Sequence, residues 1–575
     1  MTRFDHGGCA AFFFLHLFLV ASRIHSSVTS SSNPPEGLTI LGTGYNILFG
    51  NPDVEFNNDQ RADGYSRRIL DLTSYVTSGS ISNQVEYVTF ETCSSRFRET
   101  IYESTKKYQH KLLEDVEIID ESKNAFANFE FSKNERYLQM EHKIDNDWHI
   151  FYESQTSCSV GKGRYMIEEA KSRPFPLSTE FVTDVCQLPS HDFLSEKYKA
   201  FLDKWGTHIV VEVELGYKER QVLYTTKEEL LQSILADKSL DNIRNELLEV
   251  KQRNSPGERS SVVIDIDRLM ESPFKKNHFT NNFENVVISQ NDLKEAISIK
   301  VMSIATVLDG TFWQLGNAYL QNGYCTPSHL EDVGVNIAKA MTSYALESDA
   351  RISKSDTVQL TVYWPAGTYT LPMVENTTCP SSQFYWSMGW RYQETENTFP
   401  DNDWSEPCHL QGPYNKRAVK LSYCTKTVAE EEESGWRFPT GSYCIMKYGE
   451  TCPTGFQEGW ILWDDENTLN SNDRSGILPA GVYDEDTLIY FCCRNDGSTL
   501  VSAIFPTDDP FYLFQYSRMC QNVLGMNVID EFFQWDGDND IRRGKNYAGG
   551  IYPRDTGDIT GSDHKLHYCY YYPAV

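Results

Sequence analysis

The C-terminal part of the chain is built from one sequence unit that occurs three times, and this repeat restricts the fold more than any other feature. Each unit opens with an aromatic residue followed by proline, at Trp364, Phe438 and Phe505. A cysteine follows each proline after 13 or 14 residues, and each unit ends on a cysteine beside an aromatic residue. Because repeated sequence folds into repeated structure, we expect three similar β units around a pseudo-threefold axis, in a β-prism-like or trefoil-like domain.

The cysteines are concentrated in this repeat. Nine of the 14 in the chain lie between residues 379 and 569, a density typical of an extracellular domain held together by disulfides. One bridge per unit is the simplest arrangement, and Cys444 and Cys493, which have no counterparts in the other units, then pair with each other. The suggested pairs, which the sequence alone does not determine, are Cys379–Cys424, Cys452–Cys492, Cys520–Cys569 and Cys444–Cys493, with Cys408 left over.

An acidic element also recurs once in each unit, shortly after an aromatic residue. Clustered carboxylate oxygens of this kind suit calcium or the hydroxyl groups of a glycan, but Asp and Asn at such places also cap the turns between strands. A complete calcium loop is absent, so we favour turn capping over a metal site. The carboxylates concerned are Glu394, Glu396, Asp464, Glu466, Asp536 and Asp538.

The repeat region is the more acidic part of the chain. From residue 364 to the end there are 15 Lys and Arg against 30 Asp and Glu, so this region carries −15 of the total formal charge of −29. Such a field repels phosphate backbones and anionic lipid headgroups. We therefore exclude nucleic acid as a partner and expect any membrane contact to use apolar surface, a neutral headgroup or a glycan.

Residues 1–26 have the features of a secretory signal peptide. Arg3 precedes an apolar run over residues 10–21, which is too short to span a bilayer and is followed by small residues. We expect the mature protein to be secreted and extracellular. Asn376 begins the sequon Asn376-Thr377-Thr378, which predicts a glycosylated surface loop.

A helix, a glycine and a strand follow one another in the N-terminal part. Apolar residues recur at helical spacing from Phe193 to Trp205, with Ser190 or Asp192 as the N-cap and Gly206 as the stop. Residues 208–216 then alternate between apolar and mixed positions, which predicts a half-buried strand.

This junction resembles the signature of the MACPF (membrane attack complex/perforin) family. The signature is a tyrosine, six intervening residues, and then an aromatic residue, Gly, Thr, His and a second aromatic residue. The matching residues are Tyr198, Trp205, Gly206, Thr207 and His208. Gly216 resembles the first glycine of the family's pair at the bend of the sheet, and residues 41–52 resemble the family's first strand. The departures are Trp205 in place of Tyr or Phe, Ile209 in place of an aromatic residue, and Tyr217 in place of a second glycine.

The resemblance covers roughly residues 36–350 and implies a bent, four-stranded antiparallel sheet flanked by two helical clusters. In this family the clusters unfurl into amphipathic hairpins that close a β-barrel among many subunits. Backbone groups in lipid must all be paired, and one subunit has too few strands to close a barrel. The implied partners are therefore a target membrane and further copies of the chain, assembled in a ring.

Both clusters can be placed in the sequence. In the first, residues 125–132 alternate over about the ten residues that a tilted membrane strand needs. In the second, apolar positions between residues 230 and 250 suit two short amphipathic helices, and a second alternating run follows. A soluble helix or surface strand would show the same patterns, but the signature between the clusters favours membrane insertion. The candidate inserting residues are Ala125, Ala127, Phe129, Phe131, Val262, Ile264 and Ile266.

The repeat region resembles the C-terminal domain of apextrin (ApeC) over about residues 364–572. The resemblance rests on motifs that include Cys452-Pro453-x-Gly455-Phe456, Phe491-Cys492-Cys493-Arg494 and Pro510-Phe511-Tyr512-Leu513. That family is associated with extracellular invertebrate proteins in defence and development and with recognition of microbial cell-wall glycans, so the resemblance implies such a glycan as a partner. Exposed tryptophans could stack on sugar rings, although we expect core positions for most of the candidates, Trp386, Trp390, Trp404, Trp460 and Trp463.

The predicted organisation is an α+β MACPF domain followed by an all-β, disulfide-rich domain. The expected segments are the signal peptide 1–26, the MACPF domain 36–350, a linker 351–363 and an ApeC-type domain 364–575 with repeats 364–429, 434–500 and 501–572.

We expect neither catalytic residues nor a cofactor, because His208 lacks a nucleophile or metal partner at a diagnostic spacing. Two functions fit these patterns. One is a secreted pore-forming protein of innate defence whose C-terminal domain recognises a surface glycan or lipid. The other is a non-lytic opsonin or developmental matrix protein that binds glycans and uses the MACPF domain as a scaffold.

Overall fold

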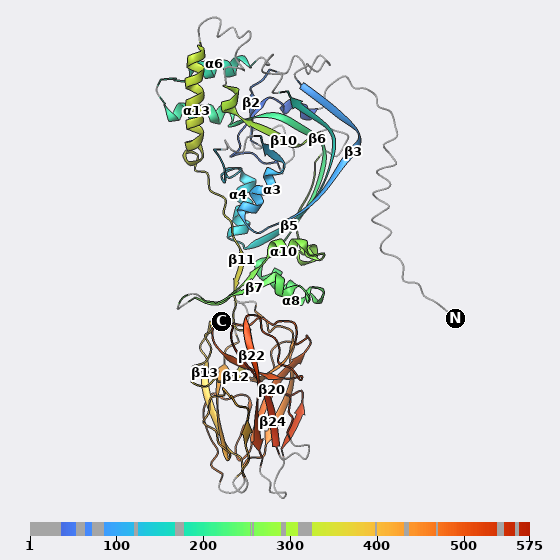
Figure 1. Ribbon diagram of the computed structural model, residues 1–575, viewed down its shortest axis with the longest axis vertical. Coiled ribbons are helices and arrows are strands. Elements are labelled where there is room, and N and C mark those ends of the chain that lie inside the picture. The colour runs from blue at the N-terminus through green and yellow to red at the C-terminus, as the bar shows by residue number, and fades with distance from the viewer. Residues whose placement is uncertain are drawn as a thin grey trace, which may run out of the picture.

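The computed structural model shows an elongated molecule in which an α+β domain stands above an all-β domain (Figure 1). It describes residues 36–52, 64–71, 85–119, 125–166, 177–191, 193–253, 255, 258–288, 295–308, 325–396, 400–429, 436–466, 470–537, 546–557 and 563–574. The predicted signal peptide, residues 1–26, lies outside these residues.

A bent antiparallel sheet organises the first domain. Strand β3 pairs with β5, and β5 pairs with β6. The first half of β6 pairs with β10 and its second half with β9, so β9 and β10 together take the place of a fourth strand. Strand β1 pairs with the start of β6, β2 pairs with β1, and β4 runs parallel to β10. The strands are β1 (Thr43–Tyr45), β2 (Tyr65–Arg68), β3 (Val85–Tyr102), β4 (Val116–Ile118), β5 (His149–Tyr165), β6 (His208–Thr226), β9 (Asn281–Ile288) and β10 (Glu295–Ser303).

Three helices cover one end of this sheet and share a large apolar core with it. They are α6 (Thr179–Gln187), α7 (Ser195–Trp205) and α13 (Pro327–Glu347), accompanied by η1 (Glu36–Ile40) and α11 (Ile304–Val307). Helix α13 starts where Thr326 accepts a hydrogen bond from the amide of His329 and proline occupies the first turn. Disulfide Cys186–Cys325 ties α6 to the residue before this cap.

Two clusters of short elements interrupt the long strands. The first joins β3 to β5 and lies on the concave side of the curved sheet (Figure 1). It holds α3 (Thr105–Leu113), β4 and α4 (Glu135–Asp145). The second joins β6 to β9 and lies between the sheet and the C-terminal domain. It consists of α8 (Lys227–Ala236), η3 (Lys238–Leu240), α9 (Arg244–Leu247), β7 (Leu248–Lys251), β8 (Ser261–Ile264), α10 (Ile266–Glu271) and η4 (Lys275–His278).

The C-terminal domain is a 13-stranded sheet whose three units exchange edge strands in a closed cycle. β13 of the first unit pairs with β18 of the second, β17 of the second with β23 of the third, and β22 of the third with β14 of the first. The first unit contains β12 (Tyr369–Pro372), β13 (Ser387–Glu394), β14 (Asp403–Trp404) and β15 (Ala418–Lys426). The second contains β16 (Ser442–Lys447), β17 (Gln457–Trp463), β18 (Asp473–Gly476), β19 (Gly481–Tyr483) and β20 (Thr487–Asn495). The third contains β21 (Phe511–Gln515), β22 (Met526–Asp536), β23 (Tyr547–Gly550) and β24 (Asp563–Pro573).

The aromatic residues that open the three units meet in one core at the end of this domain nearest the first domain. Each contacts a ring of a neighbouring unit: Trp364 lies 5.2 Å from Phe511, and Phe438 lies 4.9 Å from Tyr369, between ring centroids. Phe505 completes the cycle at 5.8 Å from Tyr443. The repeat therefore produces a threefold arrangement because equivalent residues make equivalent contacts with the next unit.

The segment predicted as a linker, residues 351–363, contains strand β11 (Val358–Thr361). This strand pairs with β8, and β8 pairs with β7, so that the three form a separate sheet inside the second cluster. The chain segment that connects the two domains therefore contributes a strand to the second cluster.

Candidate functional site

The signature residues lie where helix α7 ends and strand β6 begins. Gly206 has φ 85° and ψ 176°, a conformation that only glycine adopts readily. A Cβ atom there would lie 2.7 Å from the amide nitrogen of Tyr45. The hydroxyl of Thr207 donates to the carbonyl of Tyr45 at 3.2 Å and accepts from the amide of Ile47 at 3.0 Å. The junction therefore pins the first strand to the central strand of the sheet.

The two aromatic residues of the signature, Tyr198 and Trp205, lie in the core, and each side chain donates a hydrogen bond. Trp205 is fully buried, and its indole nitrogen donates to Asp184 at 2.8 Å. The hydroxyl of the buried Tyr198 donates to the carbonyl of Pro189 at 2.7 Å. The predicted helix cap is wrong for Ser190, because the N-cap of α7 is Leu194 with no side-chain hydrogen bond; Asp192 lies outside the described residues.

His208 is buried beside Thr207, and its Nδ1 lies 2.8 Å from the Thr207 hydroxyl. Burial alone lowers the pKa of His208 to about 3, so the ring is neutral at physiological pH. Its ring packs 5.9 Å from that of Phe126. These contacts make His208 a neutral structural residue between the sheet and the first cluster.

Acidification is expected to destabilise this domain through His208. The folded state holds the ring neutral down to about pH 3, whereas the unfolded chain has the ordinary histidine pKa of 6.5 and binds a proton. The contribution of the neutral His208 ring to the free energy of unfolding is therefore complete above pH 6.5. It is lost as the pH falls toward 3, by up to about 1.4 kcal/mol per pH unit. Urea unfolding at several pH values should show a smaller pH dependence for His208→Gln than for the wild type. Equal pH dependence in the two proteins would contradict this assignment.

Strand β6 shows the predicted alternation over residues 212–215, where Val213 and Leu215 are buried and Glu212 and Glu214 are half-buried, but not over its first four residues. Residues 208–211 are all buried, because β1, β10 and the helices cover both faces there. At the bend, a Cβ atom on Gly216 would lie 1.9 Å from the carbonyl oxygen of Cys158. Disulfide Cys93–Cys158 crosses from β3 to β5 at the same level, and the side chain of Tyr217 is 44% exposed. A glycine is thus required at position 216, whereas a tyrosine fits at 217.

The first candidate inserting segment is not a strand in this structure. Residues 125–134 form successive turns, in which Asn128 and Phe131 adopt φ of 74° and 65°. Phe126 and Phe131 are both fully buried although they belong to opposite sides of the predicted alternation. Ala125 and Phe129 are partly buried against the same core, and Ala127 is exposed. Tertiary packing decides these orientations, because a series of turns does not preserve the twofold period of a strand.

Buried ion pairs fasten the first cluster to the sheet. Lys111 of α3 lies 3.1 Å from Glu153 of β5, and Arg220 of β6 lies 3.8 Å from the same carboxylate. The Lys218 ammonium of β6 lies 2.7 Å from the Asp115 carboxylate. Burial acts to raise the pKa of Asp115, but the neighbouring positive charges, that of Lys218 first, hold this pKa below its ordinary value. The side chains named here are at most 6% exposed. Buried ion pairs as well as apolar contacts therefore hold the first cluster against the sheet.

The second cluster packs in a second apolar core, to which strands β3, β5 and β6 also contribute residues. Helix α8 follows a capping box formed by Thr226 and Glu229, as its sequence favours. Val262 and Ile264 are buried in β8, but Ile266 begins helix α10 and Val250 lies in strand β7. The prediction of a strand that extends to Ile266 is therefore wrong, and so is the prediction of a helix that extends to Val250. The strand ends before Ile266 because the side chain of Asp265 caps α10 by accepting a hydrogen bond from the amide of Arg268.

Residues of the acidic elements in the C-terminal domain form hydrogen bonds with neighbouring units. The backbone amides of Glu394, Asp464 and Asp536 each donate to an asparagine of another unit, Asn472, Asn546 and Asn402 respectively, at 2.7–2.9 Å. Burial raises the pKa of Asp536 to about 6. Glu396 and Glu466 are buried, and Asp538 lies outside the described residues. In the described part of the chain no group of three or more His, Cys, Asp or Glu side chains is placed to hold a metal ion.

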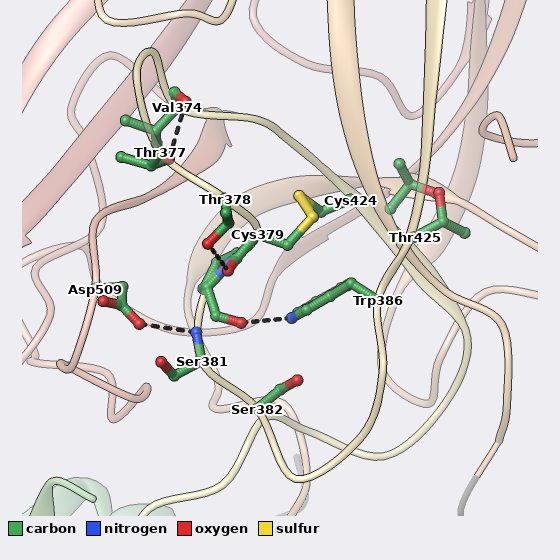
Figure 2. The surroundings of a disulfide bond; sticks show 12 residues. Val374, Thr377, Thr378, Cys379, Ser381, Ser382, Trp386, Cys424, Thr425 and Asp509 are labelled. Atoms are coloured by element: carbon green, nitrogen blue, oxygen red, sulfur yellow. Dashed lines mark hydrogen bonds between the residues drawn. A yellow bond between two sulfur atoms is a disulfide. The ribbon is translucent and has the colours of Figure 1, made fainter. Parts of the chain in front are cut away.

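The structure contains the four bridges that the repeat suggests in the C-terminal domain, Cys379–Cys424, Cys452–Cys492, Cys520–Cys569 and Cys444–Cys493. Figure 2 shows the first of them, with Trp386 close by. The indole nitrogen of Trp386 donates to the backbone carbonyl of Pro380 at 2.7 Å. Cys408 is the free cysteine among the described residues. Asn376 is exposed in the loop before Cys379.

Of the five candidate tryptophans, Trp463 is buried and the others are partly exposed. Trp390 lies on the outer face of β13, where the Lys420 ammonium sits 3.9 Å from its ring centroid. Phe532 occupies the equivalent position in the third unit, under Lys565 at 3.6 Å. Trp460 occupies it in the second unit, opposite Tyr490. Sequence reasoning missed Phe532, although it precedes Asp536 by four residues, just as Trp390 precedes Glu394 and Trp460 precedes Asp464.

Within the described residues, no helix combines the length and apolar character that a membrane crossing requires. The chain has no match among the curated proteins. Similar solved structures include a protein with a MAC/Perforin domain from Bacteroides thetaiotaomicron, 10% identical with a TM-score of 0.27 over 61% of this chain and 68% of that chain. GNIP1Aa from Chromobacterium piscinae is 9% identical with a TM-score of 0.30 over 93% and 82%. Astrotactin-2, a vertebrate perforin-like membrane protein involved in neuronal development, is 11% identical with a TM-score of 0.20 over 47% and 97%.

Two domain families account for most of the sequence. The MAC/Perforin domain matches residues 30–301, and the C-terminal domain of apextrin matches residues 364–571. Neither is an enzyme domain. The bent sheet with its two clusters and the disulfide-rich threefold domain agree with these matches in position and in fold class. The chain is therefore a perforin-like protein that joins a MAC/Perforin domain to the C-terminal domain of apextrin.

Proposed function

We propose that the protein is a secreted pore former that docks through its C-terminal domain, assembles with copies of itself and inserts both clusters into a target membrane. One observation carries this proposal: each cluster is an insertion between two neighbouring strands of one continuous sheet. The first occupies residues 103–148 between β3 and β5, and the second occupies residues 227–280 between β6 and β9. Straightening a cluster would therefore lengthen the two strands that flank it into a hairpin.

The clusters are long enough for this change. They contain 46 and 54 residues, which allows more than 20 residues in each arm of a hairpin. A tilted strand needs about 9–11 residues to cross the hydrocarbon core of a bilayer. In such hairpins the alternating residues Ala125, Ala127, Phe129 and Phe131, and Val262, Ile264 and Ile266, are the candidates for the lipid-facing side.

The outer strands of the sheet support self-assembly. Among the described strands β3 pairs only with β5, and β9 pairs only with β6. The 18-residue β3 exposes Val88, Phe90 and Phe97, the last at 64%. A long, exposed edge with apolar side chains is an unusual feature of a soluble sheet and favours pairing with another chain. Pairing β3 of one copy with β9 of the next would satisfy both edges, and a closed ring would leave none.

The charges beneath the first cluster fit the water-filled side of such a barrel. Glu153, Lys218 and Arg220 lie on the face of the sheet that the cluster covers. Departure of the cluster would expose this face to solvent. A charged face suits the lumen of a membrane barrel, whose interior is polar.

The outward aromatic residues of the C-terminal domain support recognition of a surface glycan. Trp390, Trp460 and Phe532 occupy equivalent places on the three units and are partly exposed. Aromatic faces stack on the apolar faces of sugar rings, and three equivalent faces would bind a repeated glycan more tightly than one.

A bridge that locks the first cluster to the sheet tests the pore proposal. Glu117 of β4 and Lys300 of β10 lie opposite each other and form an ion pair at 2.7 Å, so Glu117→Cys with Lys300→Cys should form a disulfide. We expect the wild type to release dye from phosphatidylcholine–cholesterol vesicles carrying peptidoglycan fragments and to form rings in negative stain. The oxidised variant should release none, and mild reduction should restore release.

The control carries the same kind of bridge within the C-terminal domain, at Val482→Cys and Leu488→Cys across β19 and β20. It should release dye in both redox states, and the wild type should tolerate the same reductant. Dye release by the oxidised first-cluster variant would contradict the proposal. A wild type that never releases dye, on varied lipids and at acid pH, would favour the non-lytic glycan-binding function instead.

A further inference from the structure

Residues 351–363, named the strap from here on, are bound to the first cluster along their first half. The amide of Lys354 donates to the Thr105 hydroxyl at 2.8 Å, and its carbonyl accepts from the amide of Lys106 at 3.0 Å. The hydroxyl of Ser353 donates to the side-chain oxygen of Gln109 at 2.8 Å. These contacts hold the strap against the start of helix α3.

The second half of the strap belongs to the second cluster. Strand β11 pairs with β8 from Val358 opposite Ile264 to Thr361 opposite Ser261. Val358 and Leu360 are buried in the core of this cluster. One short segment therefore contacts both clusters, which lie far apart in sequence.

The C-terminal domain completes the core of the second cluster. Trp436 and Ile504 of that domain are 5% and 3% exposed and pack in the same apolar core as β8 and the strap. The side chain of Asp508 accepts from the amide of Ser260 at 2.9 Å, and the Ser260 hydroxyl accepts from the amide of Thr507 at 3.1 Å. Asp508, Ser260 and Thr507 are all buried. The two domains are thus joined by a specific, desolvated contact as well as by the chain.

Two arginines of the second cluster extend this contact to the first disulfide loop of the C-terminal domain. Arg259 donates to the carbonyl of Ser382 at 2.7 Å, and Arg253 lies 3.6 Å from the carboxylate of Asp509. Figure 2 shows that Asp509 also accepts from the amide of Ser381, at 2.8 Å. The cluster therefore contacts both the first and the third unit of the C-terminal domain.

We propose that the strap and this interface hold both clusters closed, and that displacement of the C-terminal domain from the second cluster is the step that frees them. The strap continues directly into Trp364, which is anchored in the core of the C-terminal domain at 1% exposure. Movement of that domain would therefore pull on β11. While β11 occupies the edge of β8, the second cluster cannot straighten into a hairpin. This inference rests on the pore-forming function proposed above.

A covalent bridge between the strap and β8 provides the test. Gln359 and Val263 lie directly opposite each other on the less buried face of the β11–β8 pair, so Gln359→Cys with Val263→Cys should form a disulfide without disturbing the core. The oxidised variant should lose dye release from the same vesicles and regain it on mild reduction. The bridge at Val482→Cys and Leu488→Cys again serves as the control.

Weakening the interface should have the opposite effect. Asp508→Ala removes the acceptor of the Ser260 amide, and we expect the rate of dye release to rise roughly tenfold, the order of effect for a lost buried hydrogen bond to a charged group. Hydrogen exchange of the β8 amides should become faster by a similar factor in the soluble protein. Asp473→Ala, at an exposed residue of the same domain, should change neither rate.

The possible results separate the two proposals. If the wild type and the oxidised Gln359→Cys/Val263→Cys variant release dye equally, the strap inference is overturned and the pore function stands. If the wild type releases no dye, the pore function fails and the strap loses its role with it. A variant that misfolds is recognised because reduction does not restore its activity.

Discussion

Replacing Gly206 by alanine should lower the free energy of unfolding of the MAC/Perforin domain by about 4 kcal/mol, because alanine is strained in this backbone conformation and its Cβ meets backbone atoms. The new Cβ would lie 2.7–2.9 Å from the amide nitrogen, carbonyl carbon and carbonyl oxygen of Tyr45. None of these atoms can turn away as the end of a flexible side chain can. Relief of the clash would require β1 to separate from β6 at the signature.

The matched control is Gly334→Ala in the middle of helix α13. A Cβ there would have one neighbour, the Cβ of Leu308 at an ordinary 3.8 Å, so alanine should stabilise the helix by about 0.5–1 kcal/mol. Urea unfolding, with hydrogen exchange of the β6 amides to identify the transition of this domain, measures both variants. Equal small effects at the two glycines would show that the junction tolerates a side chain.

Glu153→Gln should destabilise the same domain by about 3 kcal/mol, because the change leaves the buried charges of Lys111 and Arg220 without their shared partner. Lys111 and Arg220 are 3% and 4% exposed and lie 3.1 and 3.8 Å from the carboxylate. Arg220 keeps Glu284 at 2.7 Å, whereas Lys111 loses the carboxylate that lies 3.1 Å from its ammonium, so most of the loss should come from Lys111. Exchange protection should fall first in α3, which carries this lysine.

Two further variants distinguish the buried pair from a surface pair. Glu180→Gln removes an exposed partner of Arg67, where both side chains are 51% exposed, and should change stability by less than about 0.5 kcal/mol. The double change Lys111→Met with Glu153→Leu removes both charges and should recover most of the stability lost in Glu153→Gln. Failure of the double variant to recover would show that packing of the carboxylate, and not the uncompensated charge, is responsible.

The elements that could be predicted from the sequence are those with a local period or a local signal. The repeat spacing led to the four bridges of the C-terminal domain, and the helix stop at Gly206 agrees with its φ of 85°. The α+β class followed from the signature and the alternating segments around it. Such features depend on neighbouring residues or on equal spacing, so the linear chain displays them directly.

Other features depend on which surfaces the fold brings together. Phe126 and Phe131 are both buried because turns with positive φ replace a strand. Bridges Cys93–Cys158 and Cys186–Cys325 join cysteines 65 and 139 residues apart, outside any repeat. The strap has the composition of a linker, yet it becomes β11 because β8 offers an unpaired edge and an apolar core beside it.

The sequence by itself thus determined two domains, a threefold disulfide framework and a glycine-dependent junction, since each is encoded by local geometry or by periodicity. Only the tertiary structure decided how the clusters are held: ion pairs beneath the first, and the strap and Asp508 against the second. The physical reason is that these contacts join residues more than 35 positions apart. Their energies depend on burial and distance in the folded chain, and no local pattern in the sequence records either quantity.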